Sequence, residues 1–181
     1  MAAGSYVALL RGINVGGKNK LPMKDLAAIF TAAGCSDVQT YIQSGNVIFH
    51  AAPSVIKTLV KKISTAIETD FGMKIPVVIF SAEEMQHAVK GNPYRKEDPE
   101  GKALHIIFLA DKASAAAAKN LDPMRSHPDR FHLRERNIYL HLPNGVARTK
   151  LTNAYFDKAL ATVTTQRNWA TTLKLLEMMQ A

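Results

Sequence analysis

Apolar residues in the first ninety positions alternate between short runs and helical stripes, which predicts the order β-α-β-β-α-β followed by a short helix. The predicted strands are residues 6–10, 38–43, 46–49 and 75–80, and the predicted helices are residues 23–33 and 53–71. The short helix begins at a capping box formed by Ser81 and Glu84 and ends at Gly91. This order is typical of a split βαβ, ferredoxin-like unit.

The two middle strands flank a serine and a glycine at 44–45, which predicts a tight antiparallel hairpin. If these two residues form the loop, Ile42 lies opposite Val47 and Thr40 lies opposite Phe49 on the core side. A loop with the glycine in first position fits the turn chemistry equally well and shifts the register, so both registers stay open.

Residues 92–102 are rich in proline, glycine and charged residues, which predicts a connecting segment. A second series of predicted elements, with weaker patterns, follows it. The elements are a strand at 103–109, an alanine-rich helix capped by Asp111, a hairpin of 130–135 and 138–142, a helix introduced by Asn153, and a last helix with Trp169. This order has no closing strand. The sequence therefore predicts an α+β protein of two ferredoxin-like units, residues 1–91 and 103–181, with antiparallel sheets and helices packed on one face.

A turn at residues 136–137 sets the expected register of the second hairpin. It places Phe131 opposite Leu142 and Leu133 opposite Leu140 on the core side. On the other side of the hairpin it places the two histidines of these strands opposite each other.

These histidines, His132 and His141, could hold a metal only if a third ligand arrived, and the neighbouring residues supply no carboxylate. We therefore expect a polar pair, no metal site and no cofactor. Cys35 is the only cysteine, which excludes an internal disulfide, and with no base beside it in the sequence we expect a partly buried, unreactive thiol. Tyr41 and the two histidines are the acid–base candidates if the protein is an enzyme whose site forms only in the fold.

Composition and charge describe a globular, basic chain. Of its 181 residues, 47% are hydrophobic and 21% are charged, which excludes disorder, collagen and coiled coils. The formal net charge of +8 is spread over both halves and favours acidic partners over basic ones. The start of the chain has no basic segment of a signal peptide, and no apolar run reaches about 18 residues. With a single cysteine, these features predict a cytoplasmic protein with no membrane partner.

The sharpest motif lies in residues 11–20, directly after the first predicted strand. Gly12, four further residues, Gly17 and Lys18 fit the first part of a phosphate-binding P-loop. Asn19 stands where that motif needs a hydroxyl for Mg²⁺, and the next helix begins only near Pro22, which argues against a nucleotide triphosphatase. The stretch carries three cations and no acid, so it is either a basic loop that contacts an anion or a purely structural loop.

The topology of the first unit bears on whether this loop meets the turn at 44–46. In a split βαβ sheet the first and third strands are antiparallel neighbours. We expect the end of the first strand and the start of the third to lie at opposite ends of the sheet, so that topology alone does not join the two loops.

Several strings of the chain resemble a family of bacterial proteins catalogued as domain of unknown function 1697 (DUF1697). They are LLRGINVGG at 9–17, the helix start at 23–26, TYIQSGNVIF at 40–49, KLTN at 150–153 and RNW at 167–169. The resemblance implies a cytoplasmic fold of two ferredoxin-like units, and it implies no activity, because none is assigned to the family. Gln166 stands where the family usually has threonine before Arg-Asn-Trp, which weakens a role for that hydroxyl.

Polar residues and glycines within these strings are candidates for one shared binding surface. They are Arg11, Gly12, Asn14, Gly16, Gly17, Lys18, Ser44, Asn46, Arg167 and Asn168. Structural roles are the alternative to this interpretation. The glycines could be needed only where the backbone has a positive φ, Asn168 could cap the last helix, and Arg167 could fix the terminus to the sheet.

Our hypothesis from the sequence is a binding protein for an anionic, phosphate-bearing ligand that uses the 11–20 loop with help from Arg167. The alternatives are an enzyme of unassigned reaction, a nucleic-acid-binding module and a protein-interaction module. RNA-recognition modules share this strand order, but residues 46–49 are largely aliphatic where such modules place aromatic residues.

Overall fold

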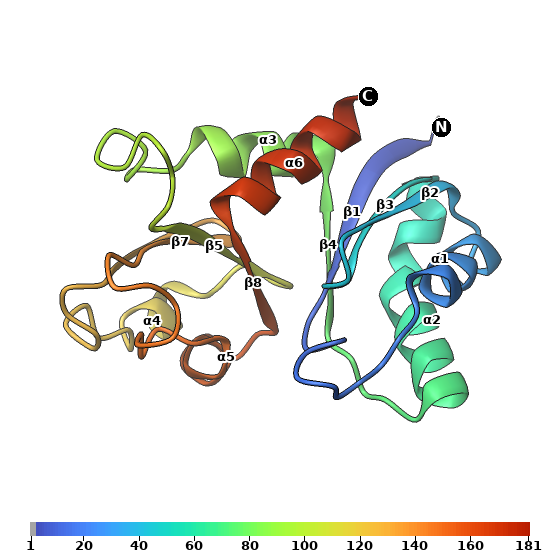
Figure 1. Ribbon diagram of the computed structural model, residues 1–181, viewed down its shortest axis with the longest axis horizontal. Coiled ribbons are helices and arrows are strands. Elements are labelled where there is room, and N and C mark those ends of the chain that lie inside the picture. The colour runs from blue at the N-terminus through green and yellow to red at the C-terminus, as the bar shows by residue number, and fades with distance from the viewer. Residues whose placement is uncertain (1–2) are drawn as a thin grey trace. The chain divides into compact units, whose positions relative to one another are not determined.

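The computed structural model describes residues 3–181 and divides into two compact units, drawn as ribbons in Figure 1. The first comprises residues 3–86 together with Lys174–Ala181, and the second comprises His87–Leu173. The divisions fall inside the helices α3 (Ala82–Lys90) and α6 (Trp169–Gln180). Each unit has its own four-stranded antiparallel sheet, so the predicted α+β class with two ferredoxin-like units is confirmed.

The first unit follows the predicted order of elements. They are β1 (Gly4–Leu10), α1 (Met23–Ala32), β2 (Ser36–Tyr41), β3 (Asn46–Ala51), α2 (Pro53–Phe71) and β4 (Val77–Ser81). The strand order is β2-β3-β1-β4, and α1 and α2 lie on the same face of this sheet (Figure 1).

Local sequence sets the ends of these helices. Pro53 occupies the first position of α2, and Gly72 ends it with a φ of 68°. The predicted capping box of α3 is confirmed: the Ser81 amide donates to Glu84 Oε2 at 2.8 Å, and the Glu84 amide donates to Ser81 Oγ at 3.2 Å.

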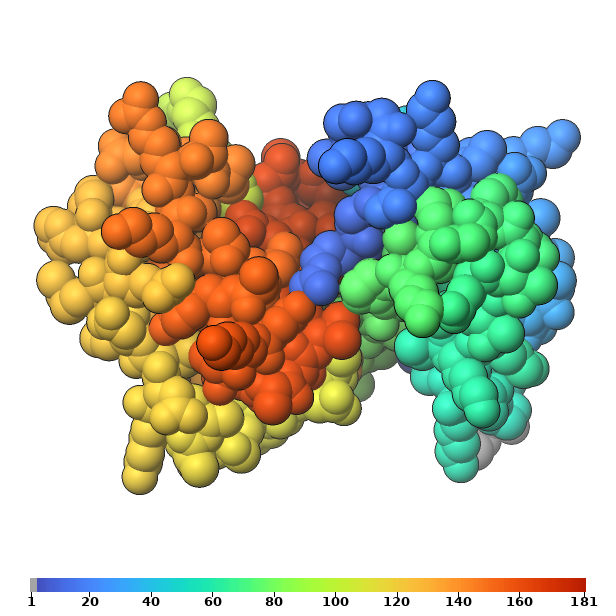
Figure 2. All heavy atoms as spheres, turned by 90° about the horizontal axis from the view of Figure 1, so that it is seen from below, coloured from blue at the N-terminus to red at the C-terminus, as the bar shows by residue number. Residues whose placement is uncertain are grey.

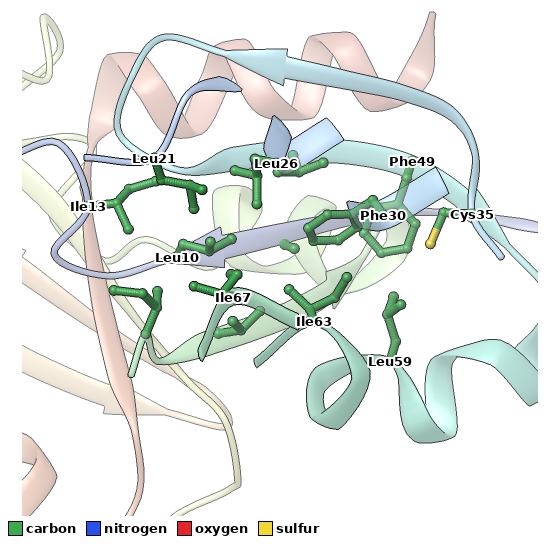
Figure 3. Packing of buried hydrophobic residues seen from close by; sticks show 14 of the residues in the cluster. Leu10, Ile13, Leu21, Leu26, Phe30, Cys35, Phe49, Leu59, Ile63 and Ile67 are labelled. Carbon is green, nitrogen blue, oxygen red and sulfur yellow. The ribbon is translucent and has the colours of Figure 1, made fainter. Parts of the chain in front are cut away.

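The core of the first unit lies between the sheet and its two helices (Figure 3). Phe30 of α1 and Phe49 of β3 pack with ring centroids 5.2 Å apart. Leu10 and Leu21, which flank the 11–20 loop, belong to the same buried cluster, as does Ile13 within the loop. The loop is therefore anchored in the core at both ends.

The first hairpin has a different register from the one predicted. Thr40 lies opposite Val47 and Tyr41 lies opposite Asn46, so both expected pairs are wrong. The loop contains four residues, 42–45, rather than two, because the Asn46 side chain donates to the Tyr41 carbonyl at 3.0 Å and closes the ladder there. Ile42 leaves the strand with a φ of 49°.

The second unit repeats the same architecture. Its elements are β5 (Leu104–Leu109), α4 (Ala115–Ala118), β6 (Arg130–Arg134), β7 (Asn137–His141), α5 (Asn153–Leu160), β8 (Thr164–Asn168) and the start of α6. The strand order is β6-β7-β5-β8, and α5 packs its Phe156 and Leu160 into a core with residues of β5 and β7.

The strand β8 closes this sheet, where the sequence pattern indicated none. It pairs antiparallel with β5 although it has no apolar run. Buried polar groups are satisfied locally instead: the Thr164 hydroxyl and amide both donate to Asp157 Oδ1, at 2.7 and 2.8 Å. Hydrophobic periodicity cannot detect a strand of this kind.

The second hairpin also differs from its predicted register. Phe131 lies opposite Leu140 and Leu133 lies opposite Ile138, so the expected pairs are wrong. The turn is one residue earlier than predicted and has Glu135 at a φ of 54°.

One helix cap in the second unit differs from the prediction, and the structure adds a second. Ser114, not Asp111, caps α4, with its hydroxyl accepting from the Ala117 amide at 3.1 Å. Thr152 caps α5 and accepts from the Tyr155 amide at 3.2 Å.

Residues 92–102, predicted as a connection, are folded against the sheet of the second unit. The Asp98 carboxylate accepts from the amides of Gly101 and Ala103, at 2.9 and 2.7 Å. The Tyr94 ring packs against the His141 ring with centroids 5.8 Å apart. This segment is thus ordered by its own turn and by aromatic contact.

Candidate functional site

Residues 14–19, within the predicted basic loop, form a small hairpin that we call the glycine hairpin. The Asn14 amide donates to the Asn19 carbonyl, and the Lys18 amide donates to the Val15 carbonyl, each at 3.0 Å. Gly16 and Gly17 at the tip have φ angles of 58° and 75°. Positive φ at both central residues is the mark of a type I′ turn, which glycine adopts without strain.

The base of the hairpin is held by the Asn14 side chain. Its Nδ2 donates to the carbonyls of Leu21 and Gln43, at 2.9 and 3.0 Å, and its Oδ1 accepts from the Leu21 amide at 2.9 Å. Asn19 Nδ2 adds a bond to the Gly12 carbonyl at 2.8 Å. These bonds and the buried Ile13 make the hairpin a defined projection rather than a loose loop.

The hairpin and the 42–45 turn lie at the same end of the sheet, contrary to our expectation. In the antiparallel β1–β3 pair, Leu9 lies opposite Asn46, and the Leu10 amide donates to the Gly45 carbonyl at 2.8 Å. The expectation was wrong because an antiparallel strand begins beside the end of its partner. Topology therefore does bring the end of β1 to the start of β3, and the Asn14–Gln43 bond joins their loops directly.

Gly45 is the point of closest packing in this arrangement. A Cβ on Gly45 would lie 2.7 Å from Leu10 Cβ and 2.9 Å from Ile13 Cδ1, and Gly45 has a φ of 78°. Both conditions exclude a side chain, so this glycine lets the turn seat against the end of β1.

Ser44 and Asn46 act within the turn itself. Asn46 Nδ2 donates to Ser44 Oγ at 2.9 Å as well as to the Tyr41 carbonyl, and Asn46 is fully buried. Ile42 is 50% exposed in the left-handed region, where a β-branched residue costs about 1–3 kcal/mol. The hydrogen bonds of Asn46 hold the turn in this conformation.

Cations gather on the hairpin and its flanks. Lys18 and Lys20 are exposed, Arg11 is half-buried, and residues 11–20 contain no acid. The Arg11 amide donates to the Pro76 carbonyl at 3.1 Å, which fixes this residue beside the start of β4.

The hairpin does not wrap an anion as a P-loop does. Its amides at positions 14 and 18 are used in its own hydrogen bonds, and α1 begins only at Met23. This agrees with the sequence argument against a nucleotide triphosphatase.

The remaining two site candidates, Arg167 and Asn168, belong to β8 of the second unit. The Arg167 guanidinium is nine-tenths buried and donates to Thr165 Oγ1 at 2.9 Å and to the Gln166 carbonyl at 2.8 Å. Burial lowers the pKa of Arg167 to about 10. Asn168 Oδ1 accepts from the Thr171 amide at 2.8 Å, so its predicted capping role at α6 is confirmed.

The expected histidine pair does not form. His132 lies opposite Tyr139, and His141 lies opposite Arg130, because the hairpin register is shifted. Tyr41, the third acid–base candidate, lies opposite Asn46 in the first unit. Across residues 3–181, no group of three histidine, cysteine or acidic side chains is arranged to hold a metal ion.

Cys35 lies in the core of the first unit, with its sulfur inside the apolar cluster (Figure 3). Burial raises the pKa of its thiol from 9.0 to about 11, and Lys62 opposes this effect. The predicted structural thiol agrees with this environment.

We expect Cys35 to react with a thiol reagent at pH 8 about a hundredfold more slowly in the folded protein than in the unfolded chain, because its thiolate fraction falls with the raised pKa. Between pH 9 and 11 the unfolded thiol ionises while the folded one stays protonated. Stability should therefore fall in this range more steeply in the wild type than in Cys35→Ala. Equal reaction rates, or equal pH slopes, would contradict the buried environment.

Sequence reasoning named Asn14 but missed what it does. Its side-chain amide donates to the Gln43 carbonyl, 29 positions away, a contact that no local pattern indicates. The strained Ile42 was also missed, because an Ile-Gln pair after a strand suggests continuation of that strand. Only the asparagine's position in a glycine-rich loop, where positive φ is common, could have signalled its role.

The chain is similar to one protein family and to a solved bacterial structure. A family model described as "Protein of unknown function (DUF1697)" matches residues 4–139. The solved structure of conserved bacterial protein SP0830 from Streptococcus pneumoniae is similar, with a TM-score of 0.71. It is 23% identical, and the alignment covers 98% of this chain and 99% of that one, a likeness that supports the fold alone.

No curated protein matches the chain. No helix within residues 3–181 is both long and apolar enough to cross a membrane. The family match covers all of the first sheet and continues into β7 of the second, which confirms the resemblance seen in the sequence strings. The chain belongs to the DUF1697 family of proteins of unknown function.

Proposed function

We propose that the protein binds a small phosphate-bearing ligand at the glycine hairpin of the first unit. The observation that carries this proposal is the tip of the hairpin, where two exposed glycines precede an exposed lysine in a stretch without acids. Exposed glycine amides and an ammonium group are the donors that phosphate oxygens accept.

The rigid base of the hairpin supports this function. A ligand that binds a preformed loop loses less free energy to ordering than one that binds a flexible loop. The three hydrogen bonds of the Asn14 side chain and the buried Ile13 hold the base in one conformation. The tip is then presented without further rearrangement.

Apolar side chains near the tip suggest what else the ligand carries. Val15 on the hairpin is 64% exposed, and Ile42 on the neighbouring turn is 50% exposed. An aliphatic or aromatic group attached to the phosphate would contact them. The proposal rests on the hairpin and not on Arg167, whose guanidinium donates to groups of its own strand.

The test is isothermal titration calorimetry with inorganic pyrophosphate at low salt. We expect Lys18→Ala to weaken binding about tenfold, since the variant loses one charge-assisted hydrogen bond. Lys57→Ala, which removes an exposed lysine from α2, is the matched control and should bind as the wild type does. If both variants bound pyrophosphate equally weakly, the lost affinity would come from net charge alone, which would contradict the proposal. The absence of any heat of binding in the wild type would also contradict it.

A further inference from the structure

Two exposed loops of the second unit are tied together into one surface. We call residues 122–129, between α4 and β6, and residues 143–150, between β7 and α5, the two-loop surface. Arg125 Nε donates to the Lys150 carbonyl at 3.0 Å, and the Lys150 amide donates to Ser126 Oγ at 2.9 Å. Ser126 Oγ also lies 3.4 Å from Thr149 Oγ1. Figure 2 shows these segments, in yellow and orange, beside each other.

The charge that this surface presents to solvent is positive. Arg125, Arg148 and Lys150 are all exposed. Of the two acids in these loops, Asp129 is buried and accepts from Ser126 Oγ at 2.8 Å. The other, Asp122, is exposed and uses its Oδ1 to accept from the Met124 amide at 2.9 Å. The surface therefore carries three exposed cations and one exposed carboxylate.

A planar platform lies within the same surface. The Arg125 guanidinium stands over the Tyr155 ring, 4.0 Å from its centroid. The Tyr155 hydroxyl accepts from the Asp122 amide at 2.8 Å, which fixes the ring in place. A guanidinium that stacks on a ring can offer its outer face to a second flat group. Met124, adjacent in sequence, is 66% exposed and adds apolar contact area.

We propose that the two-loop surface binds single-stranded nucleic acid, with phosphates at Arg148 and Lys150 and a base stacked on the Arg125–Tyr155 pair. Proteins that bind single strands combine cations along the backbone with aromatic or guanidinium planes under the bases. An acidic peptide would satisfy the cations equally well but would leave the planar platform unused. The platform is therefore the observation that favours a nucleic acid.

The test is fluorescence anisotropy with a labelled single-stranded oligouridylate over a range of salt concentrations. We expect the double variant Arg148→Ala/Lys150→Ala to bind at least about tenfold more weakly than the wild type at low salt. Its slope of log K against log salt should be shallower by about 1.4, since each phosphate contact to a single strand contributes about 0.7. The matched control is Lys61→Ala/Lys62→Ala, which removes two exposed lysines from α2 of the first unit and should leave affinity and slope unchanged.

A second variant tests the platform separately from the charge. Arg125→Lys keeps the cation and loses the plane, so we expect weaker binding at an unchanged salt slope. Thermal unfolding of each variant checks that the loops stay folded. Equal losses in the two double variants, displacement of the oligonucleotide by polyglutamate at equal charge concentration, or no binding at low salt would overturn the proposal.

Discussion

Replacing Gly101 by alanine should destabilise the second unit by about 4 kcal/mol. A Cβ at this position would lie 2.2 Å from Trp169 Cδ1 and 3.0 Å from Cγ, well inside van der Waals contact. The indole cannot move away easily, because Trp169 is buried and the Arg95 guanidinium lies over it, 5.5 Å from the ring. Trp169 is the only tryptophan, so urea denaturation followed by its fluorescence reports directly on this contact.

Gly145→Ala is the matched control for Gly101→Ala. Gly145 has a φ of 76°, close to the 74° of Gly101, but nothing lies within 4 Å of its added Cβ. Both variants carry the same backbone strain of about 1–2 kcal/mol. The difference between their free energies of unfolding therefore measures the collision with the indole. Equal losses in the two variants would show that Gly101 does not pack on Trp169.

The second large effect is expected for Gly45→Ala in the first unit, at about 3–4 kcal/mol. The added Cβ would collide with Leu10 Cβ and Ile13 Cδ1, and neither atom can retreat because both side chains are buried in the core. The turn would have to lift away from the end of β1. Urea denaturation measures the loss, and hydrogen exchange at the Leu10 amide, which donates to the Gly45 carbonyl, measures the local opening.

Gly72→Ala controls for backbone strain in the same unit. Gly72 ends α2 with a φ of 68°, and its added Cβ meets nothing within 4 Å. We expect Gly72→Ala to lower the free energy of unfolding by about 1 kcal/mol and to leave hydrogen exchange at the Leu10 amide unchanged. If Gly45→Ala behaved in the same way, the close packing of the turn against β1 would be refuted.

Elements with strong local signals could be predicted from the sequence. The α2 helix has a regular apolar stripe, a proline at its first position and a glycine after its end, and the structure has it at Pro53–Phe71 as predicted. The capping box of α3 was equally readable, because both residues act on each other's backbone within four positions.

Elements whose stability comes from distant partners could not be predicted in this way. β8 is polar, and its place in the sheet depends on Asp157, seven positions away, and on pairing with β5. Both hairpin registers were wrong, because Ile42 and Glu135 take positive φ angles that sequence patterns rarely predict for such residues.

In the candidate site, too, some features could be predicted from the sequence and others could not. The basic, glycine-rich character of residues 11–20 was evident from the sequence. Its position beside the 42–45 turn follows from the antiparallel pairing of β1 with β3, a rule that our expectation applied wrongly. The Asn14–Gln43 bond itself has no sequence signal, because it joins segments separated by a whole helix and strand. The sequence also could not show that the loop is a hairpin, since the pairing of Val15 with Lys18 depends on how both ends are anchored in the core.

The central claim, that the glycine hairpin binds phosphate, is tested most directly by amide chemical shifts during a titration with pyrophosphate. We predict that the amides of Gly16, Gly17 and Lys18 shift first and furthest, that they saturate together, and that Lys18→Ala reduces these shifts. Shifts centred elsewhere in the protein, or no shifts at the hairpin at the highest soluble concentration, would contradict the account.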